Sequence, residues 1–303
     1  MGGDRIFTWL TAAMGLVVIA VLGAIAIELL VGSGPVWSRF GFGFLTSTQW
    51  DPVKGLYGAL PYVAGTVTSS VLAMAIAVPV GIATAVFIAE FAPRRIAAPI
   101  TIAVELVAAI PSVIIGLWGL LVLSQLLSQN VEAPIVNNFG WLPFVGSNAT
   151  GSDLFTASLL LALMITPTIV ALSREVVSSI PRMQHDGLLG LGGTRWEAVR
   201  MVVLPAARTG IFGACILALG RALGETIAVT MVIGNTGKVP TGLFDPAQTI
   251  ASQIASNWSE ASIGLETDSL VALGLVLAVL TVSTVVAARL IMHGRGPAVG
   301  APA

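Results

Sequence analysis

One polar, basic segment interrupts the chain: Ile180-Pro-Arg-Met-Gln-His-Asp-Gly-Leu-Leu-Gly-Leu-Gly-Gly-Thr-Arg-Trp-Glu-Ala-Val-Arg-Met-Val-Val-Leu-Pro205. Five of the 14 Lys and Arg residues lie between Arg174 and Arg208, and long apolar runs flank this region on both sides. Apolar residues make up 56% of the 303-residue chain, charged residues make up 10%, and the mean hydropathy is +0.94. A soluble fold does not hide this much apolar surface, so the composition indicates an integral membrane protein.

Six apolar runs reach the roughly 20 residues that a helix needs to cross a bilayer core. They cover about residues 6–31, 58–92, 97–127, 153–173, 209–233 and 269–291. The second and third runs exceed a straight crossing, which favours tilt, kinks or a re-entrant part. The first run is longer than the ~7–15-residue core of a signal peptide, so we expect a retained helix. The pattern predicts an all-α membrane protein with six transmembrane helices in a single domain, residues 1–303.

The Lys and Arg residues indicate the orientation of these helices, because cytoplasmic loops carry the excess of positive charge. With the N-terminus inside, the three outer-loop cations are Arg39, Lys54 and Lys238. The inner flanks then hold ten: Arg5, Arg94, Arg95, Arg174, Arg182, Arg195, Arg200, Arg208, Arg289 and Arg295. We therefore expect both termini, and the polar segment at 181–205, to be cytoplasmic.

The polar segment predicts two short helices joined by a tight turn. Pro181 suits the first turn of a helix, and Gly192 follows a short apolar face as a helix breaker. Thr194 is typical of an N-cap, with Glu197 as its capping-box partner. An amphipathic second helix should follow and end at Pro205. Such a segment either lies flat in the membrane interface or inserts apolar side chains into a groove on a partner.

The spacing within this segment resembles the EAA loop of ABC-importer permeases. The family pattern is Glu-Ala-Ala, three residues, Gly, nine residues, Ile, one residue and Leu-Pro. This chain has Asp186-Gly187-Leu188, Gly192, Val202 and Leu204-Pro205 at the same spacing, and it departs from the pattern in the first three residues. The resemblance implies that residues 181–205 form a coupling helix seated in a cleft of an ATPase subunit. The coupling residues would be Asp186, Gly187, Leu188, Leu191, Gly192, Thr194, Trp196, Leu204 and Pro205.

The chain lacks the sequence of a nucleotide-binding P-loop, which ends in Gly-Lys-Ser/Thr. Its two lysines, Lys54 and Lys238, are followed by Gly55 and Val239. We therefore expect no catalytic residues, no metal site and no cofactor on this chain. ATP and magnesium would bind to the partner ATPase.

Charged residues inside the apolar runs are the candidates for a substrate path. Arg221 lies near the middle of the fifth run, where an ionised side chain is costly unless it faces a cavity or a partner. Glu225 is four residues further on, which predicts a shared helical face. Glu105 lies in the third run, and Ser112 follows a helix break expected near Pro111. A buried Arg–Glu pair that only fixes packing and an anion path both fit these residues.

Three further stretches resemble PstC-type permeases of the phosphate-specific ABC importer: Gly220–Asn235, Tyr57–Thr66 and Ala109–Gly119. The similarity extends over about residues 5–292. It implies a type I importer (MetI-like) permease fold in a bacterial plasma membrane. It also implies a phosphate path at Arg221, Glu225, Glu105 and Ser112. The partners implied are a PstA-like second permease, two PstB-like ATPases and an extracytoplasmic PstS-like phosphate-binding protein, with no nucleic acid.

Three alternatives remain open from the residues alone. A permease for sulfate or molybdate would also use a membrane arginine. A proton-driven secondary transporter would use Glu105 and Glu225 as proton relays. A sensor that does not transport would report on phosphate through the outer loops.

Overall fold

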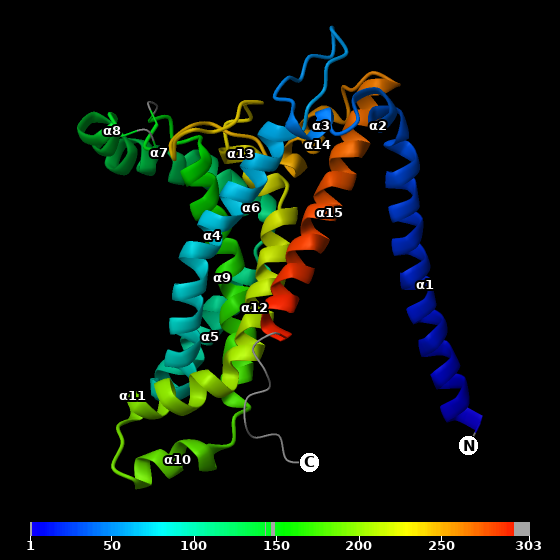
Figure 1. Ribbon diagram of the computed structural model, residues 1–303. Helices are drawn as coiled ribbons and strands as arrows, with labels where there is room; N and C mark the ends of the chain where they lie inside the picture. The colour runs from blue at the N-terminus through cyan, green and yellow to red at the C-terminus, as the bar shows by residue number, and fades with distance from the viewer. Residues whose placement is uncertain (1, 143, 147–148, 294–303) are drawn as a thin grey trace.

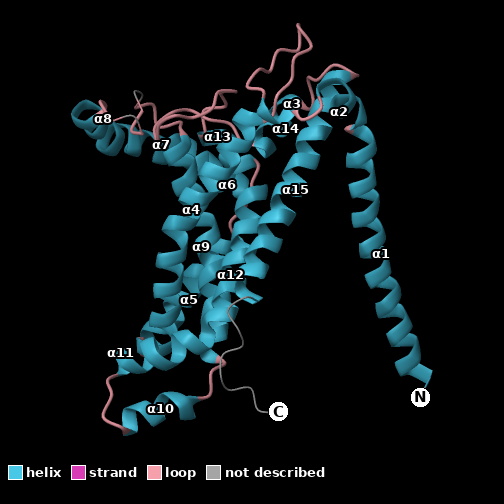
Figure 2. Cartoon of the chain, viewed as in Figure 1, coloured by secondary structure: helices cyan, strands magenta, loops and turns pink. Residues whose placement is uncertain are grey.

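The computed structural model describes residues 2–142, 144–146 and 149–293, and Arg295 of the predicted inner flank lies outside them. Within these residues the chain consists of helices and loops, with two isolated β-bridges and no strand (Figure 2). Six helical stretches of this part are long and apolar enough to cross a membrane. They are Ile6–Phe40, Leu60–Phe91, Ser112–Phe139, Leu154–Ser178, Arg195–Gly224 and Leu265–Leu290. The predicted all-α architecture with six spans is confirmed.

The two ends of the molecule differ in what they carry (Figure 1). Helix α1 (Gly2–Gly32) begins at the same end of the molecule as α10 (Arg182–Gly190) and α11 (Arg195–Ala198), and α15 (Leu265–His293) runs toward that end. The short helices α2 (Gly34–Phe40), α3 (Gly43–Thr46) and α14 (Ile250–Asn257) cover the opposite end. Toward its N-terminal end, α1 diverges from the other spans. The chain therefore has an α10 end and an opposite, loop-rich end.

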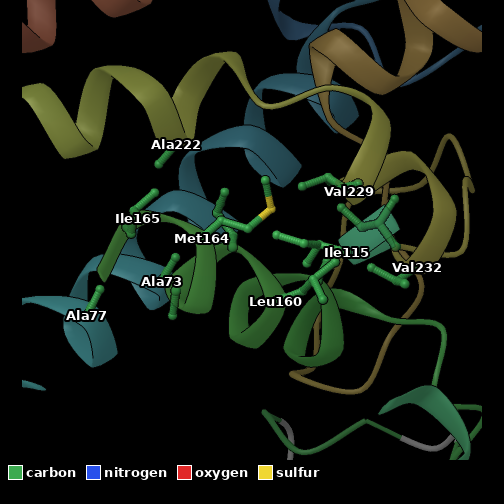
Figure 3. Packing of buried hydrophobic residues seen from close by; sticks show 14 of the residues in the cluster. Ala73, Ala77, Ile115, Leu160, Met164, Ile165, Ala222, Val229 and Val232 are labelled. Carbon is green, nitrogen blue, oxygen red and sulfur yellow. The ribbon is translucent and has the colours of Figure 1, made fainter. Parts of the chain in front are cut away.

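The core of the bundle forms where α4 (Leu60–Val86) and α9 (Leu154–Ser178) pack along one another and α12 (Leu204–Gly224) packs on α9. Small residues on α4 allow this close approach. A Cβ atom on Gly81 would lie 2.7 Å from Cγ2 of Ile169, which leaves no room for a side chain. Figure 3 shows the buried cluster, which includes Ala73, Ala77, Ile115, Leu160, Met164, Ile165, Ala222, Val229 and Val232.

The third predicted helix, 97–127, is divided in two. Helix α5 (Arg94–Ala109) ends before Ile110 and Pro111, whose backbones are extended with ψ of 128° and 138°. The residue before a proline is disfavoured in the helical region, which explains the break. Helix α6 (Ser112–Trp118) then starts the third span. That span continues through η2 (Gly119–Leu123), α7 (Ser124–Leu127), η3 (Ser128–Glu132) and α8 (Ala133–Phe139).

The fifth predicted helix also differs from the observed one. Helix α11 passes through the π-helical η4 (Val199–Val203) directly into α12, so the prediction that a helix ends at Pro205 is wrong. Pro205 instead occupies the first turn of α12, directly after the π-helical η4 and inside the continuous helix. The helix ends at Gly224. Glu225 is extended, with ψ of 127°, and α13 (Ile227–Val232) follows Thr226.

Two buried carboxyl groups meet near the loop-rich end. Asp153 caps α9, with Oδ1 accepting from the Thr156 N–H at 2.8 Å. Glu132 accepts from the Thr156 hydroxyl at 3.2 Å and from the Gly151 N–H at 2.8 Å. Both carboxyls are fully buried, and Oδ2 of Asp153 has no hydrogen-bond partner in the described part of the chain. Burial raises the pKa of Asp153 to about 7; the Thr156 N–H opposes this increase and the Glu132 charge adds to it.

This pKa predicts how stability depends on pH. The folded chain keeps a proton on Asp153 that the unfolded chain releases near its ordinary pKa of 3.8. Stability should therefore fall as the pH rises from about 4 to about 7, by up to about 4 kcal/mol. Asp153→Asn keeps a cap acceptor but cannot ionise, so it should flatten this pH dependence. Thermal unfolding in detergent across this pH range measures the effect.

The control for this experiment is Asp51→Asn. Asp51 is ion-paired with Lys54 at 3.1 Å, and its pKa is lowered chiefly by the side-chain hydrogen bond to Lys54. The control should leave the decline in stability in place. An Asp153→Asn protein with the same pH slope as the unmodified chain would contradict the assignment.

Candidate substrate path and coupling surface

The polar segment forms the expected helix, turn and helix at the α10 end. Gly192 has φ of +89°, a left-handed conformation that favours glycine. A Cβ on Gly193 would lie 3.0 Å from Leu188 Cγ, so the turn folds tightly against α10. The Thr194 hydroxyl accepts from the Glu197 N–H at 3.3 Å, and Glu197 Oε2 accepts from the Thr194 N–H at 2.7 Å. The predicted capping box is confirmed.

This segment presents apolar side chains to its surroundings. Met183 and Leu191 are 81% and 86% exposed, and Trp196 is 57% exposed. The Trp196 ring lies 6.5 Å from that of Phe91, in η1 (Phe87–Phe91), so α11 rests on the end of the second span. Exposed apolar tips on a rigid polar turn are typical of a docking surface.

The structure divides the predicted coupling residues into two groups. Six of them, Asp186, Gly187, Leu191, Gly192, Thr194 and Trp196, are exposed on α10, the turn and α11, and Leu188 is half-buried beneath the turn. Leu204 and Pro205 begin the span α12 instead, and Leu204 packs against the apolar cluster under the loop. The exposed part of the predicted coupling segment is therefore limited to α10, the turn and α11.

Arg221 lies in the last turn of α12, where its side chain is exposed. Its guanidinium makes no hydrogen bond or ion pair with another described residue. The predicted helical face shared with Glu225 is wrong, because the helix ends at Gly224 and Glu225 is extended. Arg221 is thus not neutralised within the described chain.

Two helix breaks lie at the same level of the bundle. Helices α6 and α13 run parallel and in contact, since a Cβ on Gly116 would lie 2.8 Å from Ala228 Cα and one on Gly119 3.2 Å from Val232. Ser112 starts α6, and Glu225 lies just before α13, so both are near the starts of these helices. Non-helical backbone at membrane depth is tolerated where it is buried in protein or lines an aqueous cavity. The breaks therefore bring non-helical backbone from two distant segments to one level of the bundle.

Glu105 lies further from the helix breaks along the chain than Ser112 and Glu225 do. It lies on α5, about one and a half turns before the break at Ile110, and is exposed with no hydrogen bond to another described residue. Ser112 and Glu225 lie at the breaks, and Arg221 lies about one turn before the second break, whereas Glu105 precedes the first break by more than a turn.

The sequence predicted Arg174 only as one of the inner-flank cations. The predicted fourth span ended at residue 173, but α9 continues to Ser178, so Arg174 lies about one turn inside the helix. Together with Arg94 and Thr101 it lines a cavity of about 1020 Å³ between α5 and α9. The sequence signal that could have indicated this cavity is an arginine that immediately follows an apolar run.

Comparison with known proteins places the chain in a family. A profile of the family described as "Binding-protein-dependent transport system inner membrane component" matches residues 77–294. The phosphate transport system permease protein PstC of Mesorhizobium japonicum is 46% identical over 94% of this chain and 89% of that protein. PstC of Haemophilus influenzae is 43% identical over 95% of this chain and 93% of that protein. PstC 2 of Mycobacterium tuberculosis is 40% identical over 97% of this chain and 93% of that protein.

Solved structures agree on the fold. A chain of a bacterial ABC transporter that imports alginate superposes with a TM-score of 0.65 at 18% identity, covering 95% of this chain and 96% of its own. A chain of the MetNI methionine ABC transporter gives a TM-score of 0.56 at 19% identity, covering 79% and 95%. The chain therefore belongs to the family of inner-membrane components of binding-protein-dependent transport systems, and within that family it is a PstC-type permease.

Proposed function

We propose that this chain is the transmembrane subunit of an ATP-driven importer that moves inorganic phosphate into the cytoplasm by alternating access. The observation that carries the proposal is the similarity to PstC phosphate permeases over nearly the whole chain. The uncompensated Arg221 beside two helix breaks supports it, because a membrane arginine without an acidic partner suits an anionic solute.

The proposed orientation places the α10 end in the cytoplasm. Helix α1 begins at that end and α15 runs toward it, so both termini would be cytoplasmic in this multi-pass inner-membrane protein. The inner side then carries the excess of Lys and Arg, as the charge bias requires. The loop-rich end would face outward and receive the PstS-like binding protein.

The chain itself would not hydrolyse ATP. Neither lysine is followed by Ser or Thr, as the end of a P-loop requires. ATP and magnesium would bind to a PstB-like ATPase dimer, and a PstA-like permease would complete the membrane part. The exposed tips at Met183 and Leu191 would fill a groove on the ATPase.

A continuous helix supports a mechanism for coupling. From Arg195 to Gly224 the chain is helical without interruption, and it bends between α11 and α12, so one helical stretch joins the ATPase-facing turn to Arg221 (Figure 1). When the ATPase closes, a displaced turn would move this helical stretch and the breaks at its far end. That motion would open the path alternately to each side of the membrane.

Arg221 would meet phosphate at the breaks. A guanidinium binds an oxyanion through two parallel hydrogen bonds. Ser112 would donate its hydroxyl, and Glu225 would promote release by repelling the anion or by exchanging a proton with it. Glu105 would act at the next stage of the same path. Sulfate or molybdate remains the closest alternative substrate, but the similarity to phosphate permeases favours phosphate.

The test is uptake by the reconstituted complex. The chain, a second permease, the ATPase and the receptor are placed in proteoliposomes, and entry of radiolabelled phosphate is measured. Uptake should require ATP and should survive a protonophore. Uptake that collapses with the protonophore and ignores ATP would identify a proton-driven carrier, whereas no uptake with normal assembly would favour a sensor. Excess sulfate or molybdate should compete poorly.

A further inference from the structure

The cavity between α5 and α9 lies on the α10 side of the helix breaks. The inner end of α9, the N-terminal half of α5 and Ile88 and Ala89 of η1 form its walls, and seven of the thirteen lining residues are apolar. Arg94, Thr101, Arg174 and Glu175 supply polar groups, and Ser178 and Ser179 continue the polar lining toward the end of α9. Two arginines and one glutamate leave a formal charge of +1 on this lining. In the proposed orientation the cavity would open toward the cytoplasm.

Arg174 is the central cation of this cavity. Its Nη1 donates to the Thr101 hydroxyl at 2.6 Å across the two helices, and the side chain is half-buried. A guanidinium has five N–H donors, so this bond leaves four of them for other acceptors. Among described residues, no carboxylate lies within ion-pair distance of Arg174 or of Arg94. A hydroxyl orients the guanidinium but cannot neutralise its charge.

The polar face of α5 connects this cavity to the breaks. Arg94, Thr101 and Glu105 are spaced by seven and four residues, which places them on one face of the helix. From Thr101 to the end of α5 at Ala109 the rise is about 12 Å. An anion released at the breaks therefore meets this cavity next along α5.

We propose that the cavity is a second phosphate site, an exit station that receives the anion from the breaks and is built on Arg174. Arg94 supplies the second cation, and Thr101 holds the Arg174 guanidinium toward the cavity. The proposal rests on the proposed function. A phospholipid headgroup presents the same chemistry, and the experiment below distinguishes it from free phosphate.

The test uses cysteine reactivity, because it reports on the cavity without ATP or receptor. Cys215 is the chain's single cysteine, so Cys215→Ala with Ala98→Cys places one thiol on the cavity wall. The complex, with cysteine-free partners, is reconstituted in zwitterionic lipid with the α10 end accessible. Negatively and positively charged methanethiosulfonates are applied from that side, with and without inorganic phosphate.

Four results are expected. Phosphate should slow modification by the negative reagent at least threefold. Arg174→Gln should remove this protection and lower the preference for the negative over the positive reagent about tenfold. Thr101→Val should keep most of the protection, because the charge remains. Arg174→Lys should keep the reagent preference but lose most of the phosphate protection, since it lacks the planar fork.

Three results would overturn the proposal. One is no phosphate protection in the parent protein. Another is protection that appears only when anionic phospholipid is added and ignores free phosphate, because the cavity would then hold a headgroup. The third is an equal loss in Thr101→Val and Arg174→Gln, because the pair would then only join α5 to α9. Failure of ATP-driven uptake would reject the proposed function and leave this measurement unaffected.

Discussion

Arg221→Gln is expected to abolish phosphate uptake, by at least 100-fold, while the complex still assembles. The guanidinium makes no hydrogen bond or ion pair with another described residue, so its removal should cost the fold little. A bidentate contact to phosphate would lose two charge-assisted hydrogen bonds, each worth about 1.5–3 kcal/mol. That loss corresponds to a factor of about 10² to 10⁴ in transport. Initial uptake of radiolabelled phosphate by the reconstituted complex measures it.

The matched control is Arg39→Gln, which makes the same chemical change at an exposed residue near the loop-rich end. It should leave the rate of phosphate entry within twofold. Arg221→Lys should retain a small fraction of transport, because the charge remains without the planar fork. Uptake at the unmodified rate by Arg221→Gln, with assembly intact, would exclude Arg221 from the path.

Leu191→Asp is expected to separate this chain from its ATPase. Leu191 lies at the turn between α10 and α11 and is 86% exposed, so the substitution should not disturb the fold. Full burial of a leucine in a partner groove stabilises a contact by about 1.5–3 kcal/mol, and a charge in that groove costs more. Co-purification of the ATPase should fall at least 10-fold, and ATP-driven uptake should fall with it.

Val53→Asp provides the control for this experiment. Val53 is 97% exposed in the loop between α3 and α4, and this loop lies at the loop-rich end, so the same kind of change is made far from the proposed ATPase surface. Its ATPase co-purification should match that of the unmodified chain. If Leu191→Asp keeps both ATPase binding and coupled transport, the exposed turn is not the docking surface.

Much of the architecture followed from local chemistry. The number of spans follows from hydropathy, because a helix in lipid must be apolar over its whole length. The Thr194–Glu197 capping box was also predictable, since its hydrogen bonds join residues three positions apart. Pro111 marked a break for a local reason as well.

Other features depend on contacts between distant residues. The end of α12 at Gly224 could not be predicted, because Glu225 follows a sequence that suits a longer helix. What accompanies the break is the packing of α13 against α6, where Gly116 lets Ala228 approach. The same limit applies to Arg174, because its bond to Thr101 spans 73 positions. Pro205 gave the wrong prediction of a helix end, because a proline in a first turn and a proline that ends a helix look alike in sequence.

The amino-acid sequence thus determined that this chain crosses a membrane about six times, carries a polar helix–turn–helix segment between two spans and resembles phosphate permeases. Each of these rests on composition, on short-range hydrogen bonds or on the order of residues. The tertiary structure decided that one uninterrupted helix joins the turn to Arg221, that two helix breaks meet at one level and that Arg174 faces a cavity. Such features arise from side chains that come together only when helices distant in the sequence pack against one another. Hydropathy does not indicate which helices are neighbours.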